Sequence, residues 1–191
     1  MTANTLKVSG RLSFSPALET RRTVGEMVAL AAWLKHLKHG DARALTIRGD
    51  LVDCIFKKQK RVENRHAKLK GVMLIHKGLC KADKRWDAAI ASAQLQSPRL
   101  PRGHIVGAVR FDGPIEDFTA DADWVAGPVV NRIGEVLLLP EPVPHTGALN
   151  LGWKVNAEAV AAIQKQFNTE AKPPSPAIIR AAQLGLRLRQ A

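Results

Sequence analysis

The side chains best suited to chemistry lie in one short charged segment, Lys60-Arg61-Val62-Glu63-Asn64-Arg65. Arg65, together with Arg48 earlier in the chain, can bind a phosphate or a carbonyl group through its several N–H donors. Lys60 can bind phosphate or act as an acid or base, and Glu63 can orient Lys60 or a water molecule. Lys60 and Glu63 are therefore the candidate catalytic residues. Arg48 and Arg65 join Lys60 as candidate ligands of an anion.

The same segment also has a purely structural interpretation. Glu63 can be held between Arg61 and Arg65 in an ion pair at a strand edge, with Lys60 solvated. For catalysis both interpretations stay open, but the surrounding charge favours anion binding. Between residues 57 and 85 there are eleven Lys or Arg and two acids, a balance of 11 − 2 = +9 out of +12 for the whole chain. A merely solvated surface seldom carries that concentration of charge.

The composition indicates a folded protein whose partner is a polyanion. With 191 residues and 46% hydrophobic content, the chain can bury a sizeable core. An isoelectric point near 10.2 favours nucleic acid as that partner. The acids gather elsewhere, with seven against a single Arg between residues 112 and 141. We therefore expect a basic side that binds RNA, and an acidic 112–141 face that is available, like the C-terminal tail, to a protein partner.

Several other classes are disfavoured. No apolar run approaches the roughly 18 to 20 residues that span a bilayer, and the N-terminus lacks the apolar segment of a secretory signal. A cytoplasmic protein without a membrane partner is therefore expected. Cys54 and Cys80 are too few for a disulfide framework and are expected to be small core residues. No Cys or His spacing is typical of a metal site, so neither a metal nor a cofactor is expected.

Histidines and tryptophans supply further candidates. His76 and His104 can act as general bases for cleavage of RNA at the 2′-hydroxyl, but both fall in strand patterns, which favours structural histidines with satisfied ring nitrogens. His66 is expected in an exposed turn. Trp124 and Trp153 are expected to be core aromatics rather than platforms for base stacking.

A predicted order of short elements positions these residues. Apolar spacing predicts an amphipathic helix over 50–60 that Asp50 caps. The segment 60–65 alternates as an extended strand does, and the apolar run 72–75 after Gly71 predicts a strand buried on both faces. Further strands are expected over 44–47, 104–111, 135–139 and 150–155, and helices over 24–37, 82–95, 157–167 and 177–190. Pro140, Pro142 and Pro144 are expected to end the strand over 135–139.

The order of these elements indicates an α+β fold. The strands do not alternate regularly with helices, which favours a small mixed β-barrel with surrounding helices over a doubly wound sheet. The domain is expected over 44–155, after an N-terminal helical lead-in over 1–43. C-terminal helices with a Pro-rich linker at 172–176 are expected to make up residues 156–191.

Several short pieces across residues 44–155 resemble, in order and spacing, the ASCH domain of the PUA-like superfamily. The pieces are Ile47-Arg48, Ile55, the segment 60–65, Gly71 with Leu74-Ile75-His76, residues 100–107 (LPRGHIVG), Pro142-Val143-Pro144, Gly147-Ala148-Leu149 and Trp153. The resemblance implies a small β-barrel with helices around a basic cleft, and a role with RNA. Family members commonly carry Pro-Trp just after the Ile-Arg, where this chain has Asp50 and Leu51, and a Gly before the Lys, where it has Gln59. Loss of that Trp removes a base-stacking platform.

We therefore expect a protein that resembles the RNA-binding ASCH domains and holds RNA in a basic cleft around Lys60 and Arg65. The expected phosphate-binding residues are all basic: Arg48, Lys57, Lys58, Lys60, Arg65, Lys68, Lys70 and Lys77. Two alternatives stay open. One is a metal-independent ribonuclease or a hydrolase of a modified nucleoside. The amidohydrolase relatives have what resembles a Thr nucleophile three positions after the Lys, and this chain has Glu63 there, which disfavours that chemistry. The other is an interaction adaptor similar to the transcription-coactivator members.

Overall fold

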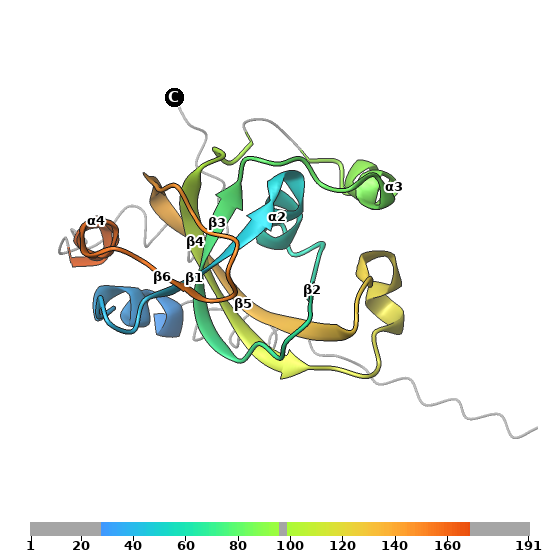
Figure 1. The fold of residues 1–191 in the computed structure, drawn as a ribbon, viewed down its shortest axis with the longest axis horizontal. Helices are drawn as coiled ribbons and strands as arrows, with labels where there is room; N and C mark the ends of the chain where they lie inside the picture. Colours follow the sequence, from blue (N-terminus) through green and yellow to red (C-terminus); the bar gives the residue numbers. More distant parts are fainter. Residues whose placement is uncertain (1–27, 96–98, 169–191) are drawn as a thin grey trace, which may run out of the picture.

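The computed structural model describes residues 28–95 and 99–168 as an α+β fold, in which one curled mixed sheet forms a half-barrel with helices around it (Figure 1). The six strands of the sheet are β1 (Arg43–Arg48), β2 (Val62–Arg65), β3 (Gly71–Gly78), β4 (His104–Pro114), β5 (Val129–Pro144) and β6 (Trp153–Lys154). The described helical segments are one over 28–35, α2 (Gly49–Phe56), α3 (Asp87–Ser92) and α4 (Ala157–Asn168), with 3-10 turns η1 (Lys84–Trp86) and η2 (Thr119–Trp124).

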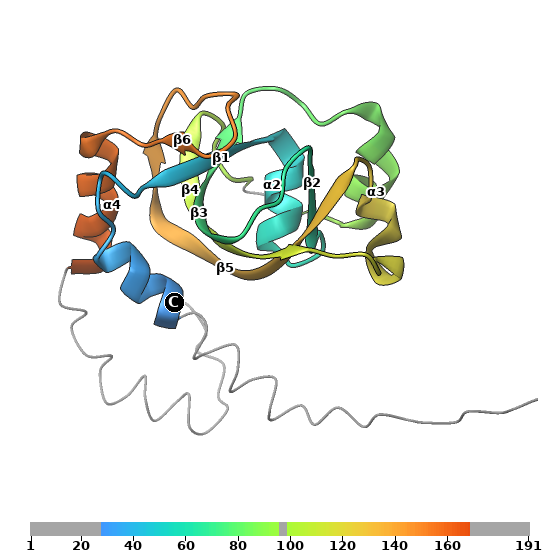
Figure 2. The ribbon, with the colours of Figure 1, turned by 60° about the horizontal axis from the view of Figure 1, so that its bottom comes forward.

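The strands lie in the order β2-β5-β4-β3-β1-β6. β1 and β3 are parallel, and all other neighbours are antiparallel. A parallel pair needs a crossover connection, which α2 and β2 provide here. β2 and β6 are therefore the two edges of the sheet. The curl brings the β2 edge round to face β1, as Figure 2 shows.

Gly107 permits a close approach that the curl requires. A Cβ atom at this position would lie 2.4 Å from Phe56 Cζ and 2.5 Å from the carbonyl oxygen of Leu137. The register between β4 and β5 shifts beside it, between Ile105 and Gly107, and such an irregularity bends a strand and increases its twist. β4 can therefore curl over α2, which lies in the hollow of the sheet (Figures 1 and 2).

Two hydrophobic clusters stabilise the fold on opposite faces of the sheet. The first lies inside the curl, where α2, α3 and η2 pack against the strands. In the second, the helix over 28–35 and α4 cover the outer face. Neighbouring side chains of β3 contribute to different clusters, since Ile75 belongs to the first cluster and Leu74 to the second. Both are almost completely buried, which confirms the prediction of a strand buried on both faces.

The prediction that three prolines end the strand over 135–139 was wrong. β5 continues through Pro140 and Pro142 to Pro144, and Val143 pairs with Ile105 of β4. The prolines occupy every second position, so their nitrogens, which lack a hydrogen, fall on one side of the strand. The β2 ladder ends at Arg132. That side of β5 therefore has no neighbouring strand at the prolines and needs no N–H donor there.

Three further predictions need correction. Asp50 does not cap α2, because the helix begins one residue earlier after Arg48, without a side-chain hydrogen bond at its N-cap. The helix expected over 82–95 is a 3-10 turn followed by the short α3. Cys80 is exposed rather than buried. Cys54 is buried as expected, and its burial raises the pKa of the thiol to about 11.

Other expected elements are confirmed or lie outside the described residues. The extended segment after the central helix is β2, and the helix expected over 157–167 is α4. Residues 1–27 of the lead-in expected over 1–43 lie outside the described residues, and so do the Pro-rich linker and the tail helix. Within the described ranges, every helix is too short or too polar to cross a membrane.

Candidate functional site

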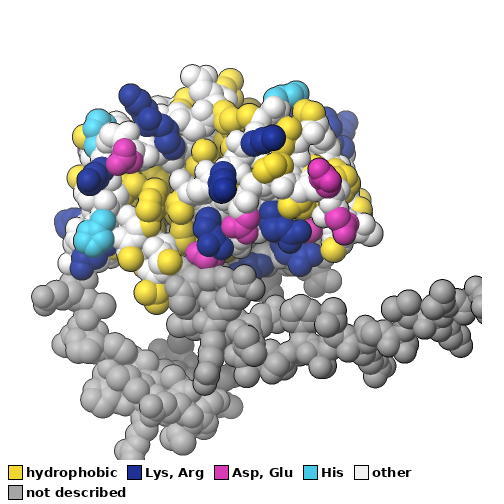
Figure 3. Space-filling view, turned by 90° about the horizontal axis from the view of Figure 1, so that it is seen from below, with side chains coloured by type: hydrophobic (Ala, Val, Ile, Leu, Met, Phe, Trp, Pro, Cys, Tyr) yellow, Lys and Arg dark blue, Asp and Glu magenta, His cyan; other side chains and the backbone are white. Residues whose placement is uncertain are grey.

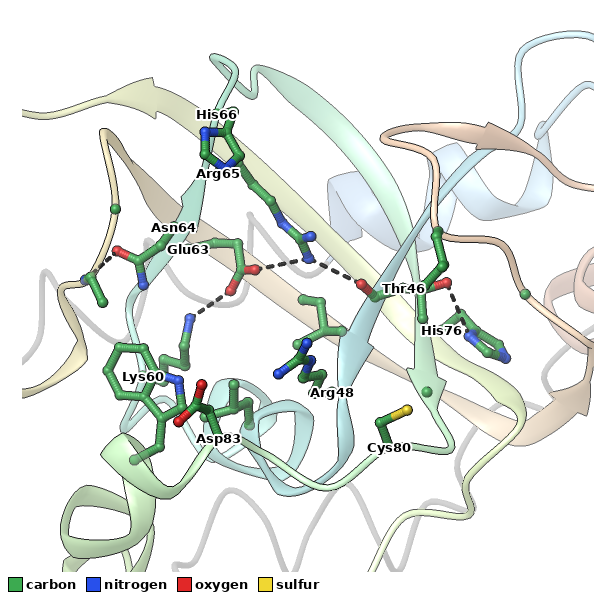
Figure 4. Close-up of a pocket in the computed structure, with 18 of the residues that line it drawn as sticks. Thr46, Arg48, Lys60, Glu63, Asn64, Arg65, His66, His76, Cys80 and Asp83 are labelled. Atoms are coloured by element: carbon green, nitrogen blue, oxygen red, sulfur yellow. Dashed lines mark hydrogen bonds and ion pairs between the residues drawn. The ribbon is translucent and has the colours of Figure 1, made fainter.

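A cavity of about 920 Å³ opens between β2 and the end of β1 (Figure 4). β2 forms one wall, and the end of β1 with the loop 146–149 forms the other. Arg48, Lys60 and Arg65 all line this cavity. The structure thus brings together three residues for which the sequence predicted an anion site. A volume in the range of about 300 to 1,000 Å³ is typical of ligand pockets.

Lys60, Glu63 and Arg65 form a continuous polar chain along the β2 wall. The Lys60 Nζ atom donates to one Glu63 carboxylate oxygen at 2.6 Å and also to the carbonyl oxygen of Val62. The second Glu63 oxygen lies 3.0 Å from Arg65 Nη2. The same Nη2 donates to the carbonyl oxygen of Thr46 at 3.0 Å. Arg65 therefore joins β2 to β1 across the opening of the half-barrel.

The members of this chain differ in burial. Lys60 is 1% exposed and Glu63 is 5% exposed, so they form a buried ion pair in which either partner would be costly to leave alone. The Arg65 side chain is 27% exposed, and its buried Nε atom has no hydrogen-bond partner in the described part of the chain. Two cations share one carboxylate here. Lys60 is thus committed to the protein, whereas Arg65 retains donors for a ligand.

The structural interpretation of this segment correctly placed Glu63 between two cations but named one of the two cations wrongly. Glu63 pairs with Arg65 as expected, but its second partner is Lys60 and not Arg61. Arg61 lies outside the cavity and binds Asp121 at 3.1 Å. Lys60 is buried rather than solvated, because its Nζ atom turns toward Val62 and Glu63.

Arg48 differs from these residues because the interaction described for its side chain is purely electrostatic, with Asp83, whose pKa it helps to lower. The Arg48 side chain is exposed, extends into the cavity (Figure 4) and makes no hydrogen bond or ion pair with another described residue. Nearby, Asp83 accepts a hydrogen bond from Arg85 Nη2 at 3.0 Å. This bond lowers the pKa of Asp83, so its carboxylate stays ionised and paired. Arg48 therefore keeps its N–H donors available to an anion that enters, with the Asp83 charge lining the same cavity.

His76 lies in the opposite wall with both ring nitrogens engaged. Nε2 lies 2.9 Å from the carbonyl oxygen of His145, and Nδ1 lies 3.2 Å from Thr46 Oγ1. A carbonyl oxygen only accepts, so we assign the hydrogen to Nε2, and Nδ1 then accepts from the Thr46 hydroxyl. Trp153 Nε1 donates to the same hydroxyl oxygen at 3.1 Å. Burial lowers the pKa of His76, which favours the neutral ring. His76 is therefore a structural histidine, as its strand pattern indicated.

The other histidine candidates divide between the cavity and the rest of the fold. His66 is exposed and lines the cavity. His104 is half-buried outside it, and its Nδ1 atom lies 2.7 Å from the carbonyl oxygen of Arg102. Trp124 and Trp153 are both 7% exposed, which confirms them as core aromatics.

The remaining predicted phosphate-binding lysines lie outside the cavity. Four of them are exposed but do not line it: Lys57, Lys58, Lys68 and Lys70. Lys77 is 1% exposed, and its Nζ atom donates to Asp53 at 2.6 Å and to the carbonyl oxygen of Leu100 at 2.8 Å. Lys77 therefore ties β3 to α2 within the core. On the face drawn in Figure 3, Lys and Arg side chains are separated by apolar and acidic ones and form no single basic patch among the described residues.

The acidic segment 112–141 is partly used within the protein. Asp121 binds Arg61, and Arg110 lies 3.0 Å from Glu135 and 3.2 Å from Asp112. Three of the seven acids are therefore paired with arginines. Less of this charge is available to a protein partner than the sequence suggests.

Sequence reasoning missed several residues of the cavity. Asn64 fixes the loop 124–128 beside β2, since its amide donates to the Trp124 carbonyl oxygen at 2.7 Å and accepts from the Ala126 N–H at 2.9 Å. Trp86 stacks on Trp124 with ring centroids 6.1 Å apart. Other missed lining residues are Thr46, Leu79, Asp83, Arg85 and Leu149. No local pattern marks these residues, because only the curl of the sheet brings them together.

Comparison with known proteins adds no assignment, because the chain matches no family model and no curated protein. Across the described ranges, no three His, Cys, Asp or Glu side chains gather where they could hold a metal ion.

Proposed function

We propose that this protein binds single-stranded RNA in the cavity, as an ASCH-type domain of the PUA-like superfamily would. The observation that carries the proposal is the convergence of Arg48 and Arg65 on one cavity, where Arg48 makes no hydrogen bond or ion pair with a described residue. Planar guanidinium groups suit phosphate because they present several N–H donors in a fixed fork. We assign the phosphate contacts to Arg48 and Arg65.

The shape of the site favours a single strand over a duplex. The cavity lies between the β2 edge and the end of β1, and the Arg65 side chain bridges it from one edge to the other. An opening of this kind admits nucleotides one after another, whereas double-stranded RNA is read across its wide minor groove over many base pairs. We assign a positioning role to the buried pair of Lys60 and Glu63, since the Glu63 carboxylate binds Arg65 and holds its side chain in place.

Binding of a labelled single-stranded RNA pool by fluorescence anisotropy tests this proposal. Arg48→Ala should weaken binding about 10- to 150-fold, because a hydrogen bond to a charged group contributes about 1.5–3 kcal/mol. The fold should be unaffected, since Arg48 makes no hydrogen bond or ion pair with a described residue. Lys57→Ala is the matched control, because it removes the same charge from an exposed residue outside the cavity. It should weaken binding less than threefold.

Two outcomes would overturn the proposal. Equal losses for Arg48→Ala and Lys57→Ala would show that net charge, and not the cavity, attracts RNA. Cleavage of the RNA in the presence of a chelator, abolished by Lys60→Met, would replace a binding module with a nuclease. The cleavage control runs on the same samples by gel electrophoresis.

A further inference from the structure

Leu79 and Leu149 stand exposed at the mouth of the cavity. Leu79 is 71% exposed and Leu149 is 95% exposed, and both line the cavity. Single exposed apolar residues are ordinary on protein surfaces. Here two of them come from segments 70 residues apart and line the same cavity as the guanidinium groups that we assign to phosphate. We call this pair the leucine rim.

The backbone holds each member of the rim in place. The Leu79 carbonyl oxygen accepts from Arg102 Nη1 at 2.6 Å, and the preceding strand is tied by the Gly103 N–H to the carbonyl oxygen of Lys77 at 2.7 Å. Gly103 also approaches Leu79 directly, since a Cβ atom there would lie 3.5 Å from Leu79 Cδ2. These contacts therefore hold the backbone of Leu79 in place while its side chain stays exposed.

The loop that carries Leu149 is anchored through histidines. His145 donates its backbone N–H to the Gly103 carbonyl oxygen at 2.9 Å, and its own carbonyl oxygen binds His76 Nε2 at 2.9 Å. The Gly147 N–H donates to His145 Nδ1 at 3.0 Å. A Cβ atom on Gly147 would lie 2.4 Å from the His76 ring, so the loop packs directly on that wall. Leu149 thus follows, two residues later, a glycine that packs on the His76 ring.

An apolar rim beside an anion site fits a ligand that alternates flat apolar groups with negative charges. We infer that the leucine rim supports the nucleobase next to the nucleotide whose phosphate binds Arg48, so that the unit recognised is at least two consecutive unpaired nucleotides. This inference rests on the proposed function. Apolar contact with a base face is tolerant of sequence, because every base has such a face. The rim therefore adds affinity for single strands without selecting a base.

A pair of trinucleotides separates the contribution of the base from that of the phosphates. One is an ordinary RNA trinucleotide, and the other has the same backbone with abasic sugars throughout. The native protein should bind the ordinary trinucleotide about 5- to 30-fold more tightly. The double variant Leu79→Ser/Leu149→Ser should lose most of this ratio while keeping its affinity for the abasic backbone. Both side chains are largely exposed, so the substitutions leave the core intact.

Leu138→Ser is the matched control, since Leu138 is 43% exposed on β5 and does not line the cavity. This variant should bind both trinucleotides as the native protein does. An unchanged ratio in the double variant, with binding still lost in Arg48→Ala, would overturn the rim and leave the proposed function standing. An equal loss in Leu138→Ser would overturn the rim as well. Failure of the native protein to bind either trinucleotide, or longer RNA, would instead remove the proposed function.

Discussion

Arg65 connects the chemistry of the site to its architecture. One terminal nitrogen, Nη2, contacts both Glu63 and the Thr46 carbonyl oxygen, at 3.0 Å each. The side chain is therefore fixed before a ligand arrives, and little side-chain entropy is lost on binding. Arg48 is not fixed in this way. We assign orientation of the ligand to Arg65 and capture of the ligand to Arg48.

His76 should make the stability of the protein depend on pH. Its pKa in the folded protein is lowered by burial from the ordinary value of 6.5, so below about that pH the unfolded chain binds a proton that the folded protein excludes. Stability should therefore be constant between pH 7 and 8 and fall as the pH decreases from about 6.5 through the lower folded value. Thermal unfolding followed by circular dichroism between pH 5 and 8 measures this change.

Substitution isolates the histidine responsible. His76→Gln should reduce the decline in melting temperature below pH 6.5, because the variant side chain does not titrate in this range. Burial also lowers the pKa of His145, so part of the decline should persist. His39→Gln, at an exposed position outside the cavity, should leave the profile unchanged. A native profile that stays flat to pH 5 would contradict the prediction.

At the scale of elements, Asp53 joins three segments of the fold. Its carboxylate accepts from Lys77 Nζ of β3 at 2.6 Å and from the Leu100 N–H at 3.1 Å. Asp53 itself lies on α2 and is 5% exposed. The contact therefore fixes α2 against β3 and places the chain just before β4. Since α2 begins at the end of the β1 wall, this polar contact also supports the cavity.

Asp53→Ala should lower the free energy of unfolding by about 3–5 kcal/mol, because it leaves the Lys77 charge buried without its partner. Asp53→Leu combined with Lys77→Met removes both charges and should be more stable than either single variant. Urea unfolding followed by tryptophan fluorescence provides the comparison. Simple additivity of the two single effects would show that the residues do not depend on each other.

Sequence patterns predicted the elements whose side chains follow one clear period. β2 was predicted because its side chains alternate, and β3 because its apolar run is continuous and follows a glycine. The length of β5 was not predicted, because proline is excluded from a strand only where its nitrogen must donate, and that depends on neighbours. The buried pairing of Asp53 with a charge 24 positions away was not predicted either, because no local pattern marks it.

The charged residues of the candidate site were predictable from the sequence, but their distribution in space was not. The charged segment around Lys60 and the earlier Arg48 were recognised because cations and acids at short spacing are visible in one dimension. The division of the cations between cavity, core and outer surface was not, since Lys77 and Lys70 look alike until the sheet curls. The leucine rim also needs the fold, because each of its members is unremarkable alone.

For the molecule as a whole, the dependence of RNA affinity on salt should be shallow. Two phosphate contacts, from Arg48 and Arg65, give a slope of log K against log salt of about −1.4 for a single strand. Adding the four exposed lysines outside the cavity, Lys57, Lys58, Lys68 and Lys70, would give six contacts and a slope of about −4. Anisotropy titrations from 50 to 300 mM salt distinguish these values. A slope near −4 would assign binding to the outer surface instead of the cavity.

The cavity lies where the curled sheet does not close, because β2 and β1 face each other without pairing. β2 has a partner only on its β5 side, and β6 covers only the first two residues of β1. An extended segment that paired with the border of β2 that no described strand occupies would fill the cavity as an added strand. A strand-forming peptide aimed at that border would consequently compete with the RNA that we propose for the cavity without resembling it.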